Sequence, residues 1–172
     1  MIYWLVFFHM KKFWLSCCWW LTSYLTCNNF LPKLQSAYRP FHSTETAVLR
    51  VLNDALFSFD NHQEVISVLL DLWSAFDAID HMLLLQRLQH RYGVGGTALK
   101  WSYLLDRTQS VKIKDVSSSE RRVLYGVPQG SVLGPLVFVL FFAPLEDVII
   151  SHGLRCMMYA DDTQLYVLSI LL

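Results

Sequence analysis

Three aspartates stand at the ends of short apolar runs. Asp71 closes one such run, and Asp161 and Asp162 stand together between two others. Burying a carboxylate without a partner is costly, so a cation or an arginine is expected close to each of them. Oxygen ligands without neighbouring His or Cys favour Mg²⁺, or alternatively Mn²⁺, over zinc. Two such ions about 4 Å apart can clamp the attacking and leaving oxygens of an in-line phosphoryl transfer.

A second reading of Asp161 and Asp162 stays open, because Asp is a common turn former and adjacent acids often mark a solvated turn. The segment 126–135, GVPQGSVLGP, adds a loop with three glycines and two prolines. In such a loop the backbone can approach a ligand closely, and Gln129 can both donate and accept hydrogen bonds. A glycine-rich loop by itself more often has a structural role, and this one lacks the lysine of a P-loop.

Hydrophobic patterning predicts the elements that position these residues. The β-branched run 65–71 is typical of a buried strand, and runs 154–160 and 163–168 predict a hairpin with both acids at its tip. Capping signals predict one helix after Ser43, ending near Asp60, and another from Asp80 to Arg91, closed by Gly93. Further elements are expected as helices at 97–106 and 136–142, an exposed strand around 111–113, a turn at 117–119 and a returning strand at 121–125.

The composition limits the class of protein but does not indicate a binding partner. The chain has 172 residues, 54% of them apolar and 16% charged, which predicts one folded domain and excludes a disordered chain. Its 14 basic and 14 acidic residues cancel. Residues 87–122 hold eight Lys and Arg against three acids, a local net charge of +5 that suits contact with a nucleic-acid backbone or, equally, a solvated surface.

The first thirty residues differ from the rest, since 21 are apolar and four are tryptophans. Two interpretations stay open: a membrane anchor or secretory signal within residues 1–30, or a mis-started end whose first twenty residues belong to no fold. The chain has four cysteines and no C-x-x-C pair, which favours a reducing intracellular compartment, nucleus or cytoplasm.

The motifs together resemble one family. Asp71 with Phe76 and Asp77, the loop 126–135, and the Y-A-D-D of 159–162 look like motifs A, B and C of a reverse transcriptase. The stretches LQSAYRP (34–40), HSTET (42–46) and DAIDH (77–81) resemble more specifically the polymerases of non-LTR (LINE-type) retrotransposons.

This resemblance implies an α+β fold: partial fingers plus palm, with a small antiparallel sheet and helices packed on one face. It implies an RNA-directed DNA polymerase that adds dNTPs to a DNA primer 3′-OH on an RNA template, with two Mg²⁺ ions. Asp71, Asp161 and Asp162 match the family's metal-binding, catalytic acids.

The resemblance also implies roles around the nucleotide. Phe76 matches the aromatic gate that excludes a 2′-OH, and Gln129 and Gly130 match the loop that contacts the incoming nucleotide and template. Arg39 matches a fingers cation near the triphosphate or template backbone, with a plain surface role as the alternative. Trp73 departs from the family's small residue, and in an extended strand its side chain would share a face with Asp71 and crowd the site.

The domain organisation expected from the resemblance has three parts: an apolar, Trp-rich segment at 1–20, a partial reverse transcriptase domain at 21–168 and a truncated end at 169–172. Motif D, the thumb and the endonuclease are expected to be missing modules of a longer parent polyprotein. Two alternative functions stay open: an inactive relic that at most binds nucleic acid, and a membrane-associated protein anchored by residues 1–30.

Overall fold

The computed structural model describes residues 2–95, 104, 107–114, 116–128 and 130–170, without the side chains of 2–14 and 168–170. Four helices carry most of the chain: α1 (Ile2–Cys27), α2 (Thr44–Asp60), α3 (His81–Tyr92) and α4 (Gly134–Ser151). The longer strands are β1 (Gln63–Leu70), β6 (Arg155–Tyr159) and β7 (Asp162–Ile170). Four two-residue strands lie between α3 and α4: β2 (Thr108–Gln109), β3 (Lys112–Ile113), β4 (Val116–Ser117) and β5 (Arg121–Arg122). This mixture of helices and small antiparallel sheets is the predicted α+β class.

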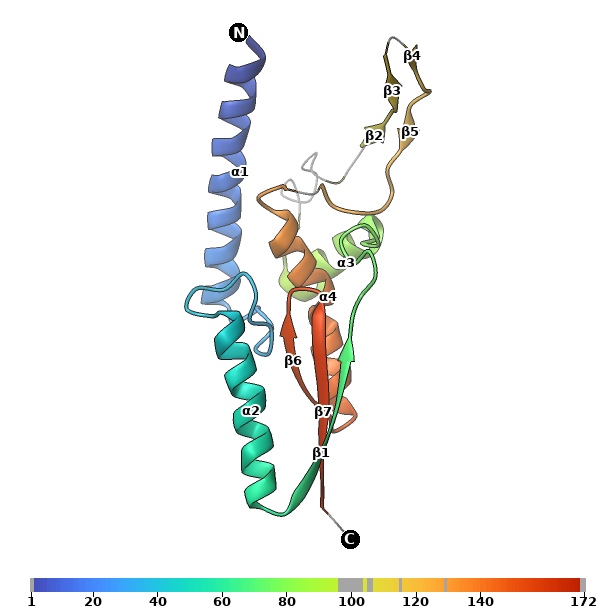
Figure 1. Cartoon of the computed structure of the whole chain (residues 1–172). Coiled ribbons are helices and arrows are strands. Elements are labelled where there is room, and N and C mark those ends of the chain that lie inside the picture. Colours follow the sequence, from blue (N-terminus) through green and yellow to red (C-terminus); the bar gives the residue numbers. More distant parts are fainter. Residues whose placement is uncertain (1, 96–103, 105–106, 115, 129, 171–172) are drawn as a thin grey trace.

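The three longer strands form one antiparallel sheet with β7 between β1 and β6 (Figure 1). In the β1–β7 ladder, Gln63 pairs with Ile170 at one end and Leu70 with Thr163 at the other. Tyr159 pairs with Asp162 in the β6–β7 hairpin, leaving a two-residue turn. The predicted hairpin is therefore confirmed, but its turn is Ala160–Asp161, and Asp162 is the first residue of β7.

The prediction that β1 is buried is wrong. Ile66, Val68 and Leu69 are 58%, 50% and 78% exposed. The strand is at the edge of its sheet, and the described elements leave both of its faces largely uncovered. A continuous apolar run indicates burial only where helices cover both faces, which depends on packing that the run itself does not encode.

Helix α4 forms the centre of the core. Phe138 and Leu140 are fully buried within it, and Leu25 of α1 and Leu84 of α3 belong to the same cluster. One helix within the described residues, α4, is long and apolar enough to cross a membrane, and 56% of that segment is buried inside the protein. Its position in the core accounts for its apolar composition.

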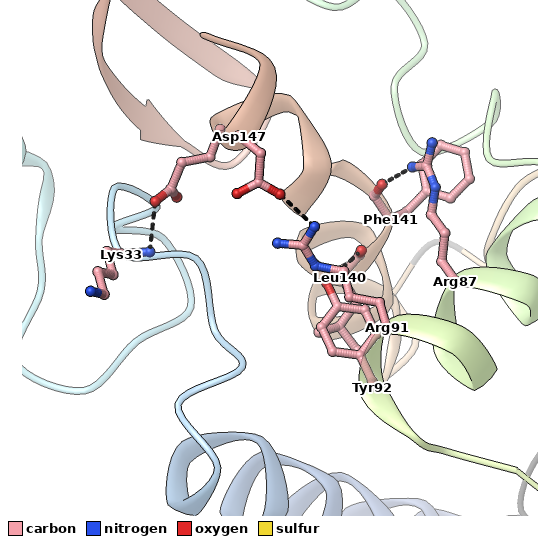
Figure 2. Close-up of polar contacts among 8 residues, drawn as sticks. Lys33, Arg87, Arg91, Tyr92, Leu140, Phe141 and Asp147 are labelled. Carbon is pink, nitrogen blue, oxygen red and sulfur yellow. Dashed lines mark hydrogen bonds and ion pairs between the residues drawn. The ribbon is translucent and has the colours of Figure 1, made fainter. Parts of the chain in front are cut away.

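Pro144 lies inside α4 and cannot donate to the carbonyl of Leu140 four residues earlier. The buried Tyr92 hydroxyl from α3 donates to that oxygen instead, at 3.0 Å (Figure 2). Arg87 donates to the neighbouring carbonyl of Phe141, and its guanidinium lies 4.4 Å from the Phe141 ring centroid. Burial lowers the pKa of Arg87 below its ordinary value. The Tyr92 side chain of α3 thus satisfies the carbonyl that the proline leaves without its helical donor.

Helices α2 and α4 contact opposite faces of the sheet. Tyr166 of β7 donates to Asp54 of α2 at 2.6 Å, whereas the preceding Leu165 packs with Ile149 of α4. Consecutive strand residues point to opposite faces. The expectation that the helices pack on one face is therefore wrong, because apolar patterning shows that a helix packs but not on which side of a sheet.

The predicted helix caps are confirmed. Ser43 and Thr46 form a capping box at the start of α2, Asp80 accepts a hydrogen bond from the Leu83 amide, and Gly93 ends α3 in the left-handed region. The predicted helix at 136–142 is confirmed as part of the longer α4. Most of the helix expected at 97–106 lies outside the described residues.

The exposed strands between α3 and α4 form a hairpin in which β2 pairs with β5 and β3 pairs with β4. Its turn falls between Ile113 and Val116, so the predicted turn at 117–119 is wrong. Ser117 belongs to β4, and the Ser118 hydroxyl accepts a hydrogen bond from the Val111 amide. Serine favours turns but is also accommodated in an exposed strand beside a tighter turn.

Helix α1 is continuous through the boundary expected between residues 20 and 21. Its last turns pack on the core: Leu25 is fully buried, and the Tyr24 hydroxyl donates to the carbonyl of Tyr92 at 2.9 Å. Trp19 and Trp20 remain 74% and 53% exposed. The C-terminal part of α1 is therefore part of the folded body.

Candidate active site

Two of the three predicted acids lie at the same end of the sheet. Leu70 and Thr163 form the last β1–β7 pair, Asp71 directly follows Leu70, and Asp162 directly precedes Thr163. Both line a cavity of about 420 Å³ between the sheet and α2. The lining also includes Thr44 and Tyr159. The two carboxylates therefore belong to one cavity at this end of the sheet.

Asp161 lies in the hairpin turn, half-buried, directly after Ala160. Ala160 has a φ of 54°, in the left-handed region that favours glycine. Burial first, and then the negative charge of Asp161 and the nearby Tyr159, raise the pKa of Tyr38. Tyr38 therefore lies within electrostatic reach of this turn. The turn is therefore strained at the residue that precedes the aspartate.

The donor atoms at this end of the sheet fit a hard divalent cation. Asp71 and Asp162 offer carboxylate oxygens from neighbouring strands, and Mg²⁺ is held in many proteins by one or two carboxylates together with substrate phosphates. Among the described residues, no group of three or more His, Cys, Asp or Glu side chains is arranged to hold a metal ion. Any ion at this place therefore takes its remaining ligands from water or a substrate.

Phe76 packs in the core rather than in the cavity with Asp71 and Asp162. Its ring stacks on the fully buried ring of Phe138, with centroids 4.5 Å apart and planes at 23°. This contact fixes the position of the half-buried ring. The role as a nucleotide gate stays a prediction.

The glycine-rich loop begins against the segment that follows β1. The amides of Gly126 and Val127 donate to the carbonyls of Ile79 and Phe76, at 2.8 and 3.1 Å. The buried His81 Nε2 lies 2.6 Å from the Gly126 carbonyl, an acceptor, so this nitrogen carries the hydrogen. The glycine-rich loop is thus joined to segment 76–79 through backbone hydrogen bonds.

Of the two predicted binding residues of this loop, Gly130 is among the described residues and Gln129 is not. Gly130 is exposed and has a φ of 72°, so the loop uses a backbone conformation that suits glycine there. Gln129 lies outside the described residues. The contact of either residue with a nucleotide or template stays a prediction.

Arg39 binds backbone carbonyls of its own loop. Its guanidinium donates to the carbonyl of Pro32 at 2.9 Å and makes longer contacts with the carbonyls of Lys33 and Gln35. It lines a separate cavity of about 280 Å³ with Tyr38 and residues of α1 and α4. The structure therefore does not bring Arg39 into the cavity that holds Asp71 and Asp162.

Trp73 does not crowd the aspartates. The extended conformation ends at Leu70, Ser74 has a φ of 53°, and the Trp73 side chain is 95% exposed. It is not among the residues that line the cavity with Asp71. The expected crowding required a longer strand, so it is absent from the described site.

Sequence reasoning assigned no role to three residues at or near the hairpin and segment 33–38. Gln35 binds the Ala160 backbone, Glu146 of α4 accepts hydrogen bonds from the amides of Lys33 and Leu34, and Tyr38 lies near Asp161. Gln35 and Tyr38 belong to the quoted stretch LQSAYRP, which was the available signal. Glu146 is a buried acid in an apolar helix and had to have a partner.

Comparisons with known proteins agree on one family. The family model described as reverse transcriptase (RNA-dependent DNA polymerase) matches residues 19–170. The RNA-directed DNA polymerase from mobile element jockey of Drosophila melanogaster is 32% identical, over 83% of this chain and 16% of that protein. The probable RNA-directed DNA polymerase from transposon BS of the same fly is 34% identical, over 73% of this chain and 14% of that protein.

A solved structure, a partial Cas6-RT-Cas1–Cas2 complex, is 27% identical, over 75% of this chain and 21% of that chain, with a TM-score of 0.37. The chain spans about a sixth of the length of the two curated fly relatives.

Proposed function

This chain belongs to the reverse transcriptases of non-LTR retrotransposons, and from that premise we propose that it carries the catalytic part of an RNA-directed DNA polymerase, palm with part of the fingers. The observation that supports this most directly is that Asp71 and Asp162 line one cavity at the same end of the sheet, with Asp161 in the adjoining turn. The substrates are dNTPs, a DNA primer and an RNA template.

Each predicted site residue has a proposed role in this reaction. Asp71, Asp161 and Asp162 would hold two divalent ions, Mg²⁺ or alternatively Mn²⁺, with water and the phosphates of the incoming nucleotide as the remaining ligands. When bound, such ions lower the barrier to in-line attack of a primer 3′-OH on the nucleotide and neutralise the leaving pyrophosphate. Phe76, Gln129 and Gly130 contact the nucleotide and template, and Arg39 supports the fingers loop.

Primer extension tests this proposal. On an RNA template with a DNA primer, the purified chain is expected to incorporate dNTPs in Mg²⁺ or Mn²⁺, and Asp71→Asn and Asp162→Asn are expected to abolish incorporation. Asp147→Asn is the matched control, because Asp147 is exposed and pairs with Arg91 (Figure 2). A wild-type chain that incorporates nothing at high concentration in Mn²⁺, or an active Asp162→Asn variant, would overturn the proposal.

Nucleic-acid binding without catalysis is the second candidate, favoured by the hairpin β2–β5. Lys112, Lys114, Arg121 and Arg122 lie on this exposed hairpin, which projects away from the three-stranded sheet in Figure 1. Phosphate contacts of this kind make affinity fall with salt. Binding of an RNA–DNA hybrid without incorporation identifies this function. Changing both Lys112 and Lys114 to Ala is then expected to reduce the salt slope by about two.

The free cysteines support a proposal for the cell compartment. All four are free thiols, and Cys17 and Cys156 are buried. Free thiols persist in a reducing environment. We therefore place the protein in the nucleus or cytoplasm, and carbonate extraction of a membrane fraction is the check. A chain retained by the extracted membranes would instead support an anchor in residues 1–30.

A further inference from the structure

Gln35 holds the residue that precedes Asp161 by both polar atoms of its side chain. Its Oε1 accepts a hydrogen bond from the Ala160 amide at 3.0 Å, and its Nε2 donates to the Ala160 carbonyl at 3.1 Å. The side chain is 1% exposed, and Oε1 also accepts from the Ala37 amide at 3.0 Å. All polar groups of one buried amide are therefore directed at two backbone positions.

The backbone around Gln35 is itself fixed to β6. The Ser36 amide donates to the Met158 carbonyl at 2.8 Å, and the Met158 amide donates to the Leu34 carbonyl at 3.0 Å. The preceding amides of Lys33 and Leu34 donate to the two carboxylate oxygens of Glu146 in α4. Gln35 thus reaches the turn from a segment that is tied to the sheet and to the core helix.

The residue that Gln35 binds has an unfavourable backbone. Ala160 has a φ of 54°, which an L-residue adopts only when its surroundings stabilise it. The bonds to its amide and carbonyl require one orientation of each peptide group that flanks Ala160. The second of these peptides leads directly into Asp161, so the orientation of the Asp161 backbone depends on it.

We propose that Gln35 is a positioning residue that fixes the Ala160–Asp161 turn and so sets where the Asp161 carboxylate lies relative to Asp71 and Asp162. The effect of Gln35 on metal binding rests on the proposed function, whereas its effect on the conformation of the Ala160–Asp161 turn does not. Gln35 itself touches no reacting atom.

Two variants separate the contributions of its two polar atoms. Gln35→Met keeps the length of the side chain and removes both bonds to Ala160. Gln35→Glu keeps an acceptor for the Ala160 and Ala37 amides and removes the donor. Gln89→Met, on an exposed position of α3, is the control for the same change of residue type.

Amide hydrogen exchange, resolved by residue, measures the hold on the turn without any ligand. In Gln35→Met the Ala160 amide is expected to exchange about tenfold faster, while core amides such as that of Phe138 keep their protection. In Gln89→Met the Ala160 amide should exchange at the wild-type rate. In Gln35→Glu, which keeps the acceptor but places a carboxylate oxygen against the Ala160 carbonyl, it should exchange at an intermediate rate. Unchanged exchange at Ala160 in Gln35→Met would overturn the hold. If Gln35→Met fails to fold, Gln35→Asn, whose shorter side chain cannot reach Ala160, takes its place, and unchanged exchange at Ala160 in that variant would overturn the hold.

Mn²⁺ titration, followed by the electron paramagnetic resonance of the free ion, measures the consequence for the acids. The affinity is expected to fall in Gln35→Met and to stay at the wild-type value in Gln89→Met. Wild-type affinity in a Gln35→Met variant whose turn exchanges quickly would overturn the positioning role. A wild-type chain that binds no Mn²⁺ would contradict the proposed function. Amide exchange alone would then show whether Gln35 fixes the Ala160–Asp161 turn.

Discussion

Asp71 and Asp162 stand next to the two residues of the last β1–β7 pair, Leu70 and Thr163, and line the same cavity. Both are exposed, and among the described residues no group of three or more His, Cys, Asp or Glu side chains is arranged to hold a metal ion. Like charges that line one cavity repel each other. We therefore expect the pair to cost stability in the absence of a cation.

Neutralising either member of this pair is expected to stabilise the metal-free protein. Asp71→Asn and Asp162→Asn should each raise Tm in EDTA by about 1–3 °C, because one repulsion is removed. Mg²⁺ should raise the Tm of the wild type, since a ligand that binds only the folded state stabilises it, and should raise that of the variants less. Thermal unfolding with and without Mg²⁺ checks both signs. Asp147→Asn should show the wild-type increment with Mg²⁺, and equal increments in all four proteins would contradict a metal site here.

Local signals in the sequence predicted the parts of the fold that depend on neighbouring residues. The caps at Ser43 and Asp80 and the β6–β7 hairpin each arise within a few residues, so spacing and residue type were sufficient. The exposure of β1 was not predictable in this way. It depends on which elements cover an edge strand, and these are distant in the chain.

The same distinction applies to the candidate site. The acids Asp71, Asp161 and Asp162 stood out because each interrupts an apolar run. The stacking of Phe76 on Phe138 and the bonds from Gln35 to Ala160 join residues far apart in the sequence, and only the packed fold brings them together. Motif resemblance marked the segment that contains Gln35 without indicating what its side chain binds.

Tyr92 and Pro144 are expected to be energetically coupled through the carbonyl of Leu140. Tyr92→Phe leaves that buried oxygen without a donor and should cost about 1–3 kcal/mol of unfolding free energy. Pro144→Ala supplies a main-chain N–H to the same oxygen, so Tyr92→Phe should cost less in that background. A double-mutant cycle in urea measures the difference. Additive costs would mean that the hydroxyl does not replace the missing helical bond.

Stability should decline between pH 10 and pH 12. Burial raises the pKa of Tyr92 from its ordinary value of 10 to about 12. The folded state therefore favours the neutral phenol, and this contribution is complete below pH 10 and lost as pH rises through 12. Urea unfolding midpoints across this range check the slope, with tyrosinate absorbance as the monitor of ionisation. Tyr92→Phe should show a shallower decline. Burial and the bond to Asp54 also raise the pKa of Tyr166, which leaves part of the slope in place.

Thiol reagents should distinguish Cys27 from Cys156. Cys27 is exposed, whereas Cys156 is 1% exposed and burial raises its pKa to about 11. At pH 8 only about one Cys156 thiol in a thousand is the reactive thiolate. Iodoacetamide labelling followed by peptide mass spectrometry should therefore modify Cys27 first and Cys156 only after urea unfolding. Rapid labelling of Cys156 in the folded protein would show that β6 opens readily.

Gly126→Ala should destabilise the protein more than Gly153→Ala. Both glycines have positive φ values, 81° and 72°, so each substitution carries the cost of a left-handed L-residue, about 1–2 kcal/mol. A Cβ at Gly126 would also lie 3.2 Å from the backbone Cα and O atoms of Asp77, whereas a Cβ at Gly153 meets nothing within 4 Å. Because the close neighbour is backbone, relief requires the glycine-rich loop to move away from the segment that follows β1. Urea unfolding of the two variants measures the difference, and equal costs would mean that the loop moves away without penalty.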